Sequence, residues 1–140
     1  MIELASARTS SLAAPEAFFA KWTDHATWPE WSPDIEWVRL DGPVVEGAAG
    51  VLKPKGGPKT RFVISTLTPG REYTDTSRFP GARLAFQHLV TRAGDHTELD
   101  VRVTLTGPLA WILVRVLGNR FRTSVPADLQ RLVELVEAEA

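Results

Sequence analysis

The chain has 140 residues, with 16 basic and 17 acidic side chains and a formal net charge of -1 at pH 7. This length suits a single domain over residues 1–140, and the balanced charge offers no global field to attract nucleic acid. The absence of cysteine excludes disulfide bonds and thiolate metal sites and fits a reducing, cytoplasmic location. The most apolar run, Leu109 to Leu117, is shorter than the roughly 20 residues that a membrane-spanning helix needs, so we expect a soluble protein without integral membrane association.

The N-terminal segment from Ile2 to Ser10 alternates in a way that predicts a strand. Its alternation places Ile2, Leu4 and Ser6 on one face and Glu3, Ala5 and Ala7 on the other. A proline at a plausible first helical position then predicts a short helix from Pro15 to Trp22. Asp24 is placed to cap a second short turn that runs toward Trp28.

Six further strands are predicted between Ile35 and Thr106, separated by Gly/Pro turn signals. They are Ile35–Asp41, Gly50–Pro54, Thr60–Thr68, Arg71–Phe79, Arg83–Thr91 and Thr97–Thr106. The separators Gly56-Gly57-Pro58, Pro69-Gly70, Pro80-Gly81 and Gly94-Asp95 allow tight turns. Connections this short predict antiparallel neighbours.

The last two strands show which side chains face the core. In the final strand, polar residues alternate with Leu99, Val101, Val103 and Leu105, which predicts one wet face and one buried face. The same rule on the preceding strand groups Leu84, Phe86, His88 and Val90. The sequence therefore predicts that His88 lies on the inward face.

A long apolar helix is predicted after Gly107-Pro108. Pro126 interrupts its pattern, so we expect either a kink there or a new helix capped by Ser124. An antiparallel sheet of consecutive hairpins has one face to bury, and this segment is the only element long enough to cover it. The combination predicts a hollow between sheet and helix, where a functional site would lie.

The string Asp24-His25-Ala26-Thr27-Trp28-Pro29-Glu30-Trp31-Ser32-Pro33, with a strand ahead of it and Gly107-Pro108 ahead of a final helix, resembles a known family. It is similar to the polyketide cyclase/dehydrase branch of the START-like, or Bet v 1-like (SRPBCC), superfamily, over nearly the whole chain. The resemblance implies an α+β helix-grip fold, in which a curved seven-stranded antiparallel sheet and two short helices are crossed by a long C-terminal helix. It also implies a central cavity for apolar ligands such as lipids, sterols, polyketides or plant hormones, and enzymatic activity in only some members.

Aromatic side chains are the first candidates for a ligand site. Trp28, Trp31 and Trp37 lie close together beside two prolines, and such amphipathic rings suit a cavity entrance. Packing between the short helices and the sheet is the alternative interpretation. The full predicted ligand-binding set is Trp28, Trp31, Trp37, Phe62, Tyr73, Leu84, Phe86, His88, Leu99, Val101, Val103, Trp111, Leu113, Leu117 and Phe121.

A second candidate group is polar, with His88, Tyr73 and Asp75 as possible catalytic residues and Arg61 on a neighbouring strand. Histidine exchanges a proton near neutral pH, and an aspartate shielded from water has a raised pKa, which together suit enolisation, aldol closure or dehydration. The alternative is that His88 is a core histidine with satisfied hydrogen bonds and that Arg61 points outward.

Other chemistries have less support in the sequence. His25, His88 and His96 lack the short spacing of a metal site, and no nucleophile elbow or phosphate-binding glycine loop is present, so neither a metal nor a cofactor is expected. The cationic hairpin between Lys53 and Arg61 is typical of a solvated turn, and a membrane or RNA contact there is the less favoured interpretation.

The function that the sequence favours is binding or carriage of a small hydrophobic molecule, lipid-like or polyketide-like, in a cavity between the sheet and the C-terminal helix. The partner is then a small hydrophobic ligand and not a nucleic acid. Two alternatives stay open: a polyketide cyclase or dehydratase with lyase-type acid–base chemistry, and an interaction module whose hydrophobic groove takes a segment of another protein.

Overall fold

The structure is a computed structural model that describes all 140 residues as one antiparallel sheet, three α-helices and a single 3₁₀ turn. The strands are β1 (Ile2–Ser11), β2 (Ile35–Leu40), β3 (Ala49–Pro54), β4 (Thr60–Thr68), β5 (Glu72–Phe79), β6 (Ala82–Ala93) and β7 (His96–Thr106). The helices are α1 (Pro15–Thr23), the 3₁₀ turn η1 (His25–Thr27), α2 (Trp28–Trp31) and α3 (Ala110–Glu139). Each predicted strand is present, with ends that differ by at most two residues.

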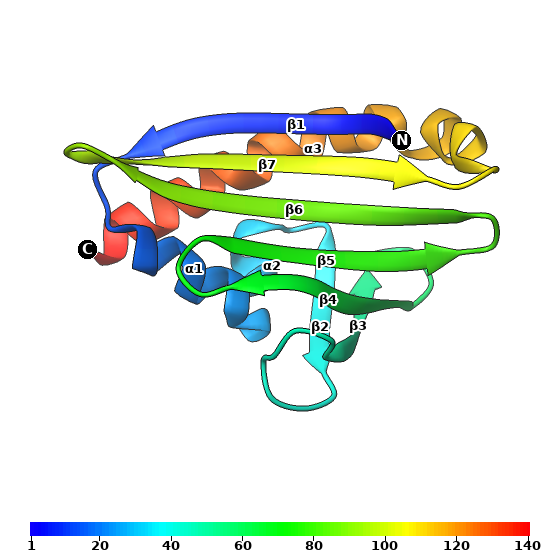
Figure 1. Ribbon diagram of the computed structural model, residues 1–140, viewed down its shortest axis with the longest axis horizontal. Coiled ribbons are helices and arrows are strands. Elements are labelled where there is room, and N and C mark those ends of the chain that lie inside the picture. Colours follow the sequence, from blue (N-terminus) through cyan, green and yellow to red (C-terminus); the bar gives the residue numbers. More distant parts are fainter.

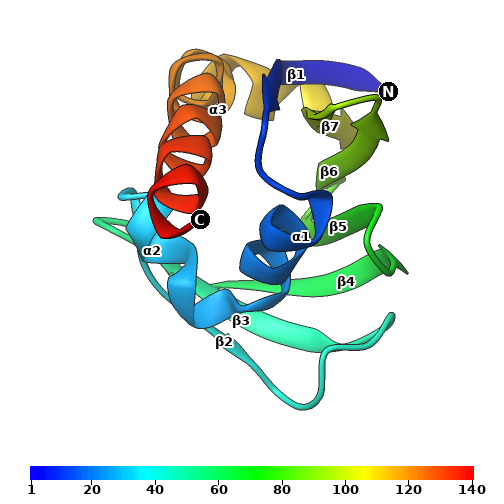
Figure 2. The ribbon, with the colours of Figure 1, turned by 90° about the vertical axis from the view of Figure 1, so that its left-hand side faces the viewer.

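The strands follow the order β1-β7-β6-β5-β4-β3-β2, and every neighbouring pair is antiparallel (Figure 1). β1 lies beside β7, while β2 to β7 follow one another as hairpins. Figure 2 shows the sheet as an arc from β1 to β2, with α3 along the open side and α2 between α3 and β2. The predicted α+β helix-grip architecture is confirmed.

The hairpin turns lie where the Gly/Pro signals predict them. Gly70 and Gly81 have φ angles of 72° and 77°, in the left-handed region that favours glycine. Gly81 is also crowded, because a Cβ on it would lie 2.6 Å from the Leu109 side chain. The turn between β5 and β6 therefore packs directly against the start of α3.

The facing of β7 and β6 is confirmed. Leu99, Val101, Val103 and Leu105 are all buried, while Glu98 and Arg102 are exposed. On β6, Leu84, His88 and Val90 are buried and Phe86 is partly buried. His88 thus lies on the inward face, as predicted.

The predicted facing of β1 is wrong because the strand contains a bulge. Its register against β7 shifts between Glu3 and Ala5, so the consecutive residues Leu4 and Ala5 are both buried. A bulge adds one residue on one strand and reverses the alternation beyond it. Ser6, grouped with Leu4 by the simple alternation, therefore lies exposed on the outer face.

Helix α3 is continuous through Pro126, so the predicted new helix capped by Ser124 is wrong. Proline has no amide hydrogen, so the carbonyl of Arg122 lacks its usual helical donor. Packing compensates for that loss, because Val125, Leu129, Leu132, Val133 and Val136 are all buried. Asp24 also differs from expectation: it lies ahead of η1, but its side chain makes no capping hydrogen bond. No helix in the structure combines the length and apolarity needed to span a bilayer.

Candidate functional site

A cavity of about 370 Å³ lies between the inward face of the sheet, α2 and α3. Residues of β2 to β7 and of all three helices line it, and 16 of the 28 lining residues are hydrophobic. Small-molecule sites have volumes of about 300–1,000 Å³ and mostly apolar walls with a few polar groups. The structure therefore contains a space suited to a small apolar guest in the place where the sequence predicts a hollow.

Ten of the residues named from the sequence line this cavity. They are Trp28, Trp31, Phe62, Leu84, Phe86, His88, Val101, Leu113, Leu117 and Phe121. Leu113, Leu117 and Phe121 follow one another at intervals of four residues, so one face of α3 forms a wall. Phe86 and Phe121 meet edge to face across the space, with ring centroids 5.4 Å apart.

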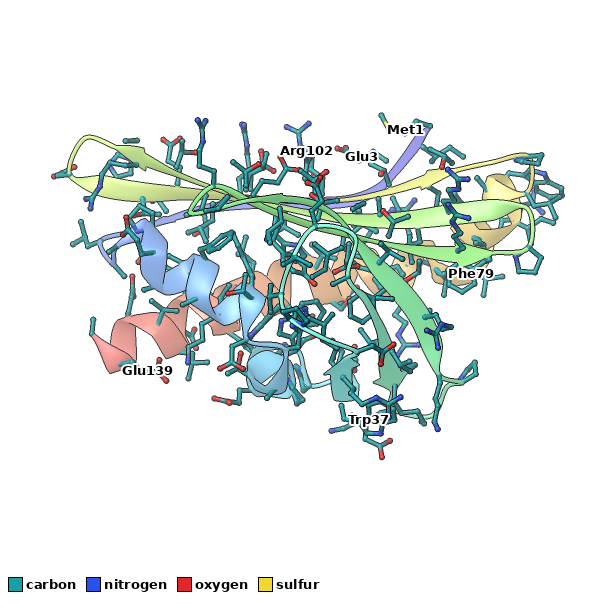
Figure 3. The ribbon with its side chains drawn as sticks, turned by 60° about the horizontal axis from the view of Figure 1, so that its bottom comes forward. Met1, Glu3, Trp37, Phe79, Arg102 and Glu139 are labelled. Atoms are coloured by element: carbon teal, nitrogen blue, oxygen red, sulfur yellow. The ribbon has the colours of Figure 1, made fainter.

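The other five predicted residues lie outside the cavity wall. Leu99, Val103 and Tyr73 belong to the packed core, with exposed fractions of 1% or less. Trp37 lies at the lower edge of the view in Figure 3, away from α3, and packs against Arg39 and Lys59. Trp111 is 56% exposed on the outer face of α3.

The carboxyl group of Asp75 is the most unusual feature of the wall. It comes from the inward face of β5, is 5% exposed, and makes no hydrogen bond to another part of the chain. Burial raises its pKa to about 8 because the ionised form has lost its hydration. At neutral pH the side chain is therefore largely an uncharged acid that offers a guest both a donor and an acceptor.

His88 is a diagonal neighbour of Asp75, because Asp75 pairs with Phe86 across β5 and β6. Its Nδ1 lies 3.1 Å from the carbonyl oxygen of Tyr73, which can only accept, so Nδ1 carries the proton. Burial lowers the pKa of His88 to about 4, which keeps the ring neutral and leaves a lone pair on Nε2. With the proton on Nδ1, Nε2 is the acceptor that His88 can offer to the cavity it lines.

Tyr73 is not available to a guest, because its hydroxyl forms a 2.7 Å hydrogen bond with Nε2 of His25. Burial raises the pKa of Tyr73 above its usual value and lowers that of His25, so both groups are neutral. Tyr73 thus lies close to His88, with ring centroids 5.7 Å apart, but its hydroxyl is occupied by His25 and its side chain does not line the cavity. Arg61 is apart from the predicted acid–base group, exposed on β4 and 3.5 Å from Asp41.

Two tryptophan N–H groups on the wall have no acceptor. Trp22 Nε1 and Trp31 Nε1 are both buried without a hydrogen-bond partner. A buried donor left unpaired costs about 1–3 kcal/mol, which an acceptor on a guest would recover. Trp22 was predicted only as part of α1, and its role in the wall depends on a helix packing against β5 and β6 that periodicity does not reveal.

A hydrogen bond between α2 and α3 closes one end of the cavity. Ser32 Oγ donates to Asp128 Oδ2 at 2.6 Å, and Arg131 lies 3.1 Å from the other carboxyl oxygen. Burial raises the pKa of Asp128 to about 6, with Ser32 and Arg131 acting in the opposite direction. This pair was not predicted, because its two residues lie 96 positions apart with no sequence signal linking them.

Gly50 on β3 determines where the Phe62 ring lies. A Cβ at this position would lie 2.6 Å from both the Phe62 ring and the Arg39 carbonyl oxygen. Glycine allows the ring to rest on the strand instead of standing upright in the cavity. The absence of a side chain at Gly50 therefore fixes the position of Phe62, which lines the cavity.

The comparisons with known proteins agree with this architecture. The family model described as "Polyketide cyclase / dehydrase and lipid transport" matches residues 1–137. A search of curated proteins returns no match.

Solved structures share the fold at low sequence identity. Protein MLL2253 from Mesorhizobium loti is similar with a TM-score of 0.74 and 13% identity, covering 96% of this chain and 98% of that one. The di-domain ARO/CYC StfQ from the steffimycin biosynthetic pathway has a TM-score of 0.76 and 15% identity, covering 96% of this chain and 50% of StfQ. The Bet v 1-like Ara h 8.0201 has a TM-score of 0.69 and 16% identity, covering 95% and 96%. With its family model matched along nearly its whole length, this chain belongs to the polyketide cyclase / dehydrase and lipid transport family.

Proposed function

We propose that this protein binds or carries a small hydrophobic molecule that bears a hydroxyl or carbonyl group. The observation that carries the proposal is that Asp75, whose carboxyl group has no hydrogen-bond partner in the chain, and its diagonal neighbour His88 both lie on the wall of a mostly apolar cavity of about 370 Å³. A protein that only filled its core would have apolar side chains at both positions, since buried polar groups without partners are destabilising.

Apolar contact alone would give weak binding. A ligand that hides roughly 300 Å² of apolar surface gains about 7 kcal/mol, against association costs of at least about 4 kcal/mol. A hydrogen bond to the Asp75 acid or to His88 Nε2 adds about 1 kcal/mol and penalises guests that lack the matching group. The apolar wall then provides affinity, and the polar pair provides selectivity.

The test compares naphthalene with 2-naphthol, which share a ring system and differ by one hydroxyl group. We expect 2-naphthol to bind about fivefold more tightly than naphthalene, in line with one net hydrogen bond. In Asp75→Leu and His88→Leu that preference should fall, while Val101→Ala, a change in the apolar wall, should weaken both ligands alike. Equal affinities in the wild type, or a preference unchanged in both polar variants, would contradict the proposal.

Native mass spectrometry of gently purified protein addresses what the cavity carries. A carrier of small molecules should retain an apolar adduct, and that adduct should decrease when Leu117→Trp fills the space. A protein whose groove instead takes a segment of a partner would show no adduct in either form.

A second candidate function is dehydration of a β-hydroxy ketone, and the acid at Asp75 is the observation that favours it. A general acid works best when its pKa is near the working pH, and about 8 meets that condition. Asp75 would protonate the departing hydroxyl while His88 Nε2 takes the α-proton, which yields an enone and water. With a pKa of about 4, His88 is a weak base, so binding without chemistry is the better-supported function. Dehydration of a β-hydroxy ketone that persists in Asp75→Asn would exclude this role.

A further inference from the structure

The first turns of α3 expose an unusual amount of apolar surface. Trp111 is 56% exposed, Ile112 40% and Val116 69%, and the preceding Leu109 is 42% exposed. Ile112 and Val116 lie on one exposed stripe of the helix, about 100° round its axis from the stripe of the wall residues Leu113 and Leu117. The helix is therefore apolar both toward the cavity and toward the outside.

The same end of the molecule is strongly cationic. Between Asp100 and Asp128 the chain has no acidic residue and four arginines, Arg102, Arg115, Arg120 and Arg122. Between Asp75 and Asp95 it has no acidic residue, and Arg78 and Arg83 flank the β5–β6 turn at this end, whereas Arg92 lies beside the β6–β7 turn at the other end (Figure 1). Arg115 lies over the Trp111 ring at 5.9 Å. Arg115 therefore puts a positive charge directly beside the exposed apolar side chains.

Arg78 and Arg83 are directly opposite each other across β5 and β6. Like charges at such a position repel, and neither guanidinium forms a salt bridge within the chain. Both line a second, shallower hollow of about 480 Å³ together with Thr106 and Gly107. Paired guanidinium groups beside a hydroxyl and open backbone are well suited to a phosphate group, which would relieve the repulsion.

These elements come together at one end of the long axis. The β5–β6 turn, the β7–α3 connection and the N-terminus all lie at the right-hand end of Figure 1, and Met1 and Phe79 lie at that end in Figure 3. The β5–β6 turn contacts the start of α3, since Leu109 N donates to the Gly81 carbonyl oxygen at 2.9 Å. We name the set Arg78, Arg83, Leu109, Trp111, Ile112, Arg115 and Val116 the basic–apolar end.

We propose that the basic–apolar end docks reversibly on the surface of an anionic phospholipid bilayer. Arginines bind lipid phosphates, while tryptophan and aliphatic side chains insert at the boundary between headgroups and acyl chains. A second copy of the chain fits less well, because a two-fold contact through this surface would bring unpaired arginines of both copies together. The proposal concerns the outer surface and does not depend on any ligand in the cavity.

Docking in this orientation has a geometric consequence. Leu113 and Leu117 line the cavity from the same turns of α3 that would contact lipid. The bilayer would then lie one helix diameter away from the cavity, so an apolar guest would have a short path between them.

The first test measures co-sedimentation with vesicles of phosphatidylcholine alone or mixed with phosphatidylglycerol. We expect binding to the anionic vesicles only, weakened by added salt. Arg78→Glu combined with Arg83→Glu should weaken it about 25-fold or more, since each arginine near the surface contributes about fivefold. Lys55→Glu combined with Arg92→Glu makes the same charge change at two exposed positions without ion pairs and should leave binding within about twofold.

The second test addresses the apolar side chains. Ile112→Ser combined with Val116→Ser should weaken binding about tenfold, while the control Leu12→Ser with Val45→Ser, at positions 79% and 50% exposed elsewhere, should not. Trp111 is much more exposed than Trp22, Trp28 and Trp31, so anionic vesicles should reduce quenching of its fluorescence by aqueous acrylamide, and Trp111→Phe should remove that change.

Four outcomes would overturn the proposal. One is equal binding to neutral and anionic vesicles, and another is equal weakening in the control variants. A third is binding of glycerol phosphate at Arg78 and Arg83 without any vesicle binding, which would identify a soluble anion site. The last is a dimer in solution that Val116→Ser dissociates, which would identify this surface as a contact between copies.

Discussion

The two halves of α3 meet the rest of the molecule in different ways. After Pro126 the helix buries Leu129, Leu132, Val133 and Val136 against the sheet. Before it, the only residues buried up to Gly118 are Ala110 and Gly118 itself, while Trp111 and Val116 are exposed. Both halves border the cavity, the second through Leu129 and Leu132, but only the second half is also packed tightly into the core.

Removing methyl groups from each half is the strongest way to test this difference. Val133→Ala combined with Val136→Ala should lower the free energy of unfolding by about 4 kcal/mol, because both side chains lie in the packed core. Leu113→Ala combined with Leu117→Ala should lower it by only about 1 kcal/mol, because these side chains already border open space. Urea denaturation measures both, and equal losses would show that the halves do not differ.

The free energy of unfolding should also depend on pH, because Asp75 on the cavity wall is protonated in the folded state at neutral pH. Its pKa is about 8 in the folded chain and near 3.8 when unfolded, so the folded state holds more protons between these values. The contribution of Asp75 to the free energy of unfolding is therefore complete below about pH 4 and is lost as the pH rises through about 8. Asp75→Asn should remove this loss and unfold with about 3 kcal/mol more free energy than the wild type at pH 9.

The matched control for that experiment is Glu30→Gln, at an exposed position on α2. It should follow the wild type across the whole pH range in thermal denaturation. His88 acts in the opposite direction, because its pKa is lowered to about 4, so its contribution is lost as pH falls below about 6.5. A wild type and Asp75→Asn variant with parallel pH profiles would contradict the protonated state of Asp75.

The hydrogen bond between α2 and α3 should have a smaller effect. Ser32→Ala removes the donor to Asp128 and should lower the free energy of unfolding by about 1.5 kcal/mol, since it leaves a partly buried carboxylate without that partner. Ser124→Ala changes another hydroxyl on the cavity wall and should cost less than about 0.5 kcal/mol. Similar losses in the two variants would mean that the hydrogen bond contributes little.

Pro126 separates the two halves of α3, and its substitution should give the smallest change in the free energy of unfolding. Pro126→Ala supplies an amide donor for the Arg122 carbonyl and should raise the free energy of unfolding by about 1 kcal/mol. Calorimetry would detect the accompanying rise in Tm. A lower stability would instead show that the path of α3 over the sheet requires proline at this position.

The fold could be predicted from the sequence wherever a pattern is local. Turn signals such as Pro69-Gly70 and Pro80-Gly81 set the hairpins, and alternation in β7 set its buried face. The bulge at Leu4 was missed, because both neighbouring residues are compatible with either facing and only the register against β7 decides. Continuity through Pro126 was also missed, since it depends on how well the flanking residues pack.

The candidate site was predicted less completely, because it depends on pairing between distant segments. His88 and Asp75 were identified as inward polar residues, and period-two spacing is enough for that. That Tyr73 bonds to His25, 48 positions away, instead of facing the cavity could not be inferred from spacing. The exposed position of Trp111 was missed for a different reason: an apolar helix face predicts burial, and nothing local indicates that it faces outward.

Gly50 does not line the cavity, yet a substitution there would change the cavity volume through Phe62, which does. A side chain at that position would collide with both the Phe62 ring and the Arg39 carbonyl oxygen, so a larger residue there would have to push the ring toward the cavity and also shift the pairing of β2 with β3. The size of ligand that fits would then depend on a residue behind the cavity wall that the ligand does not contact.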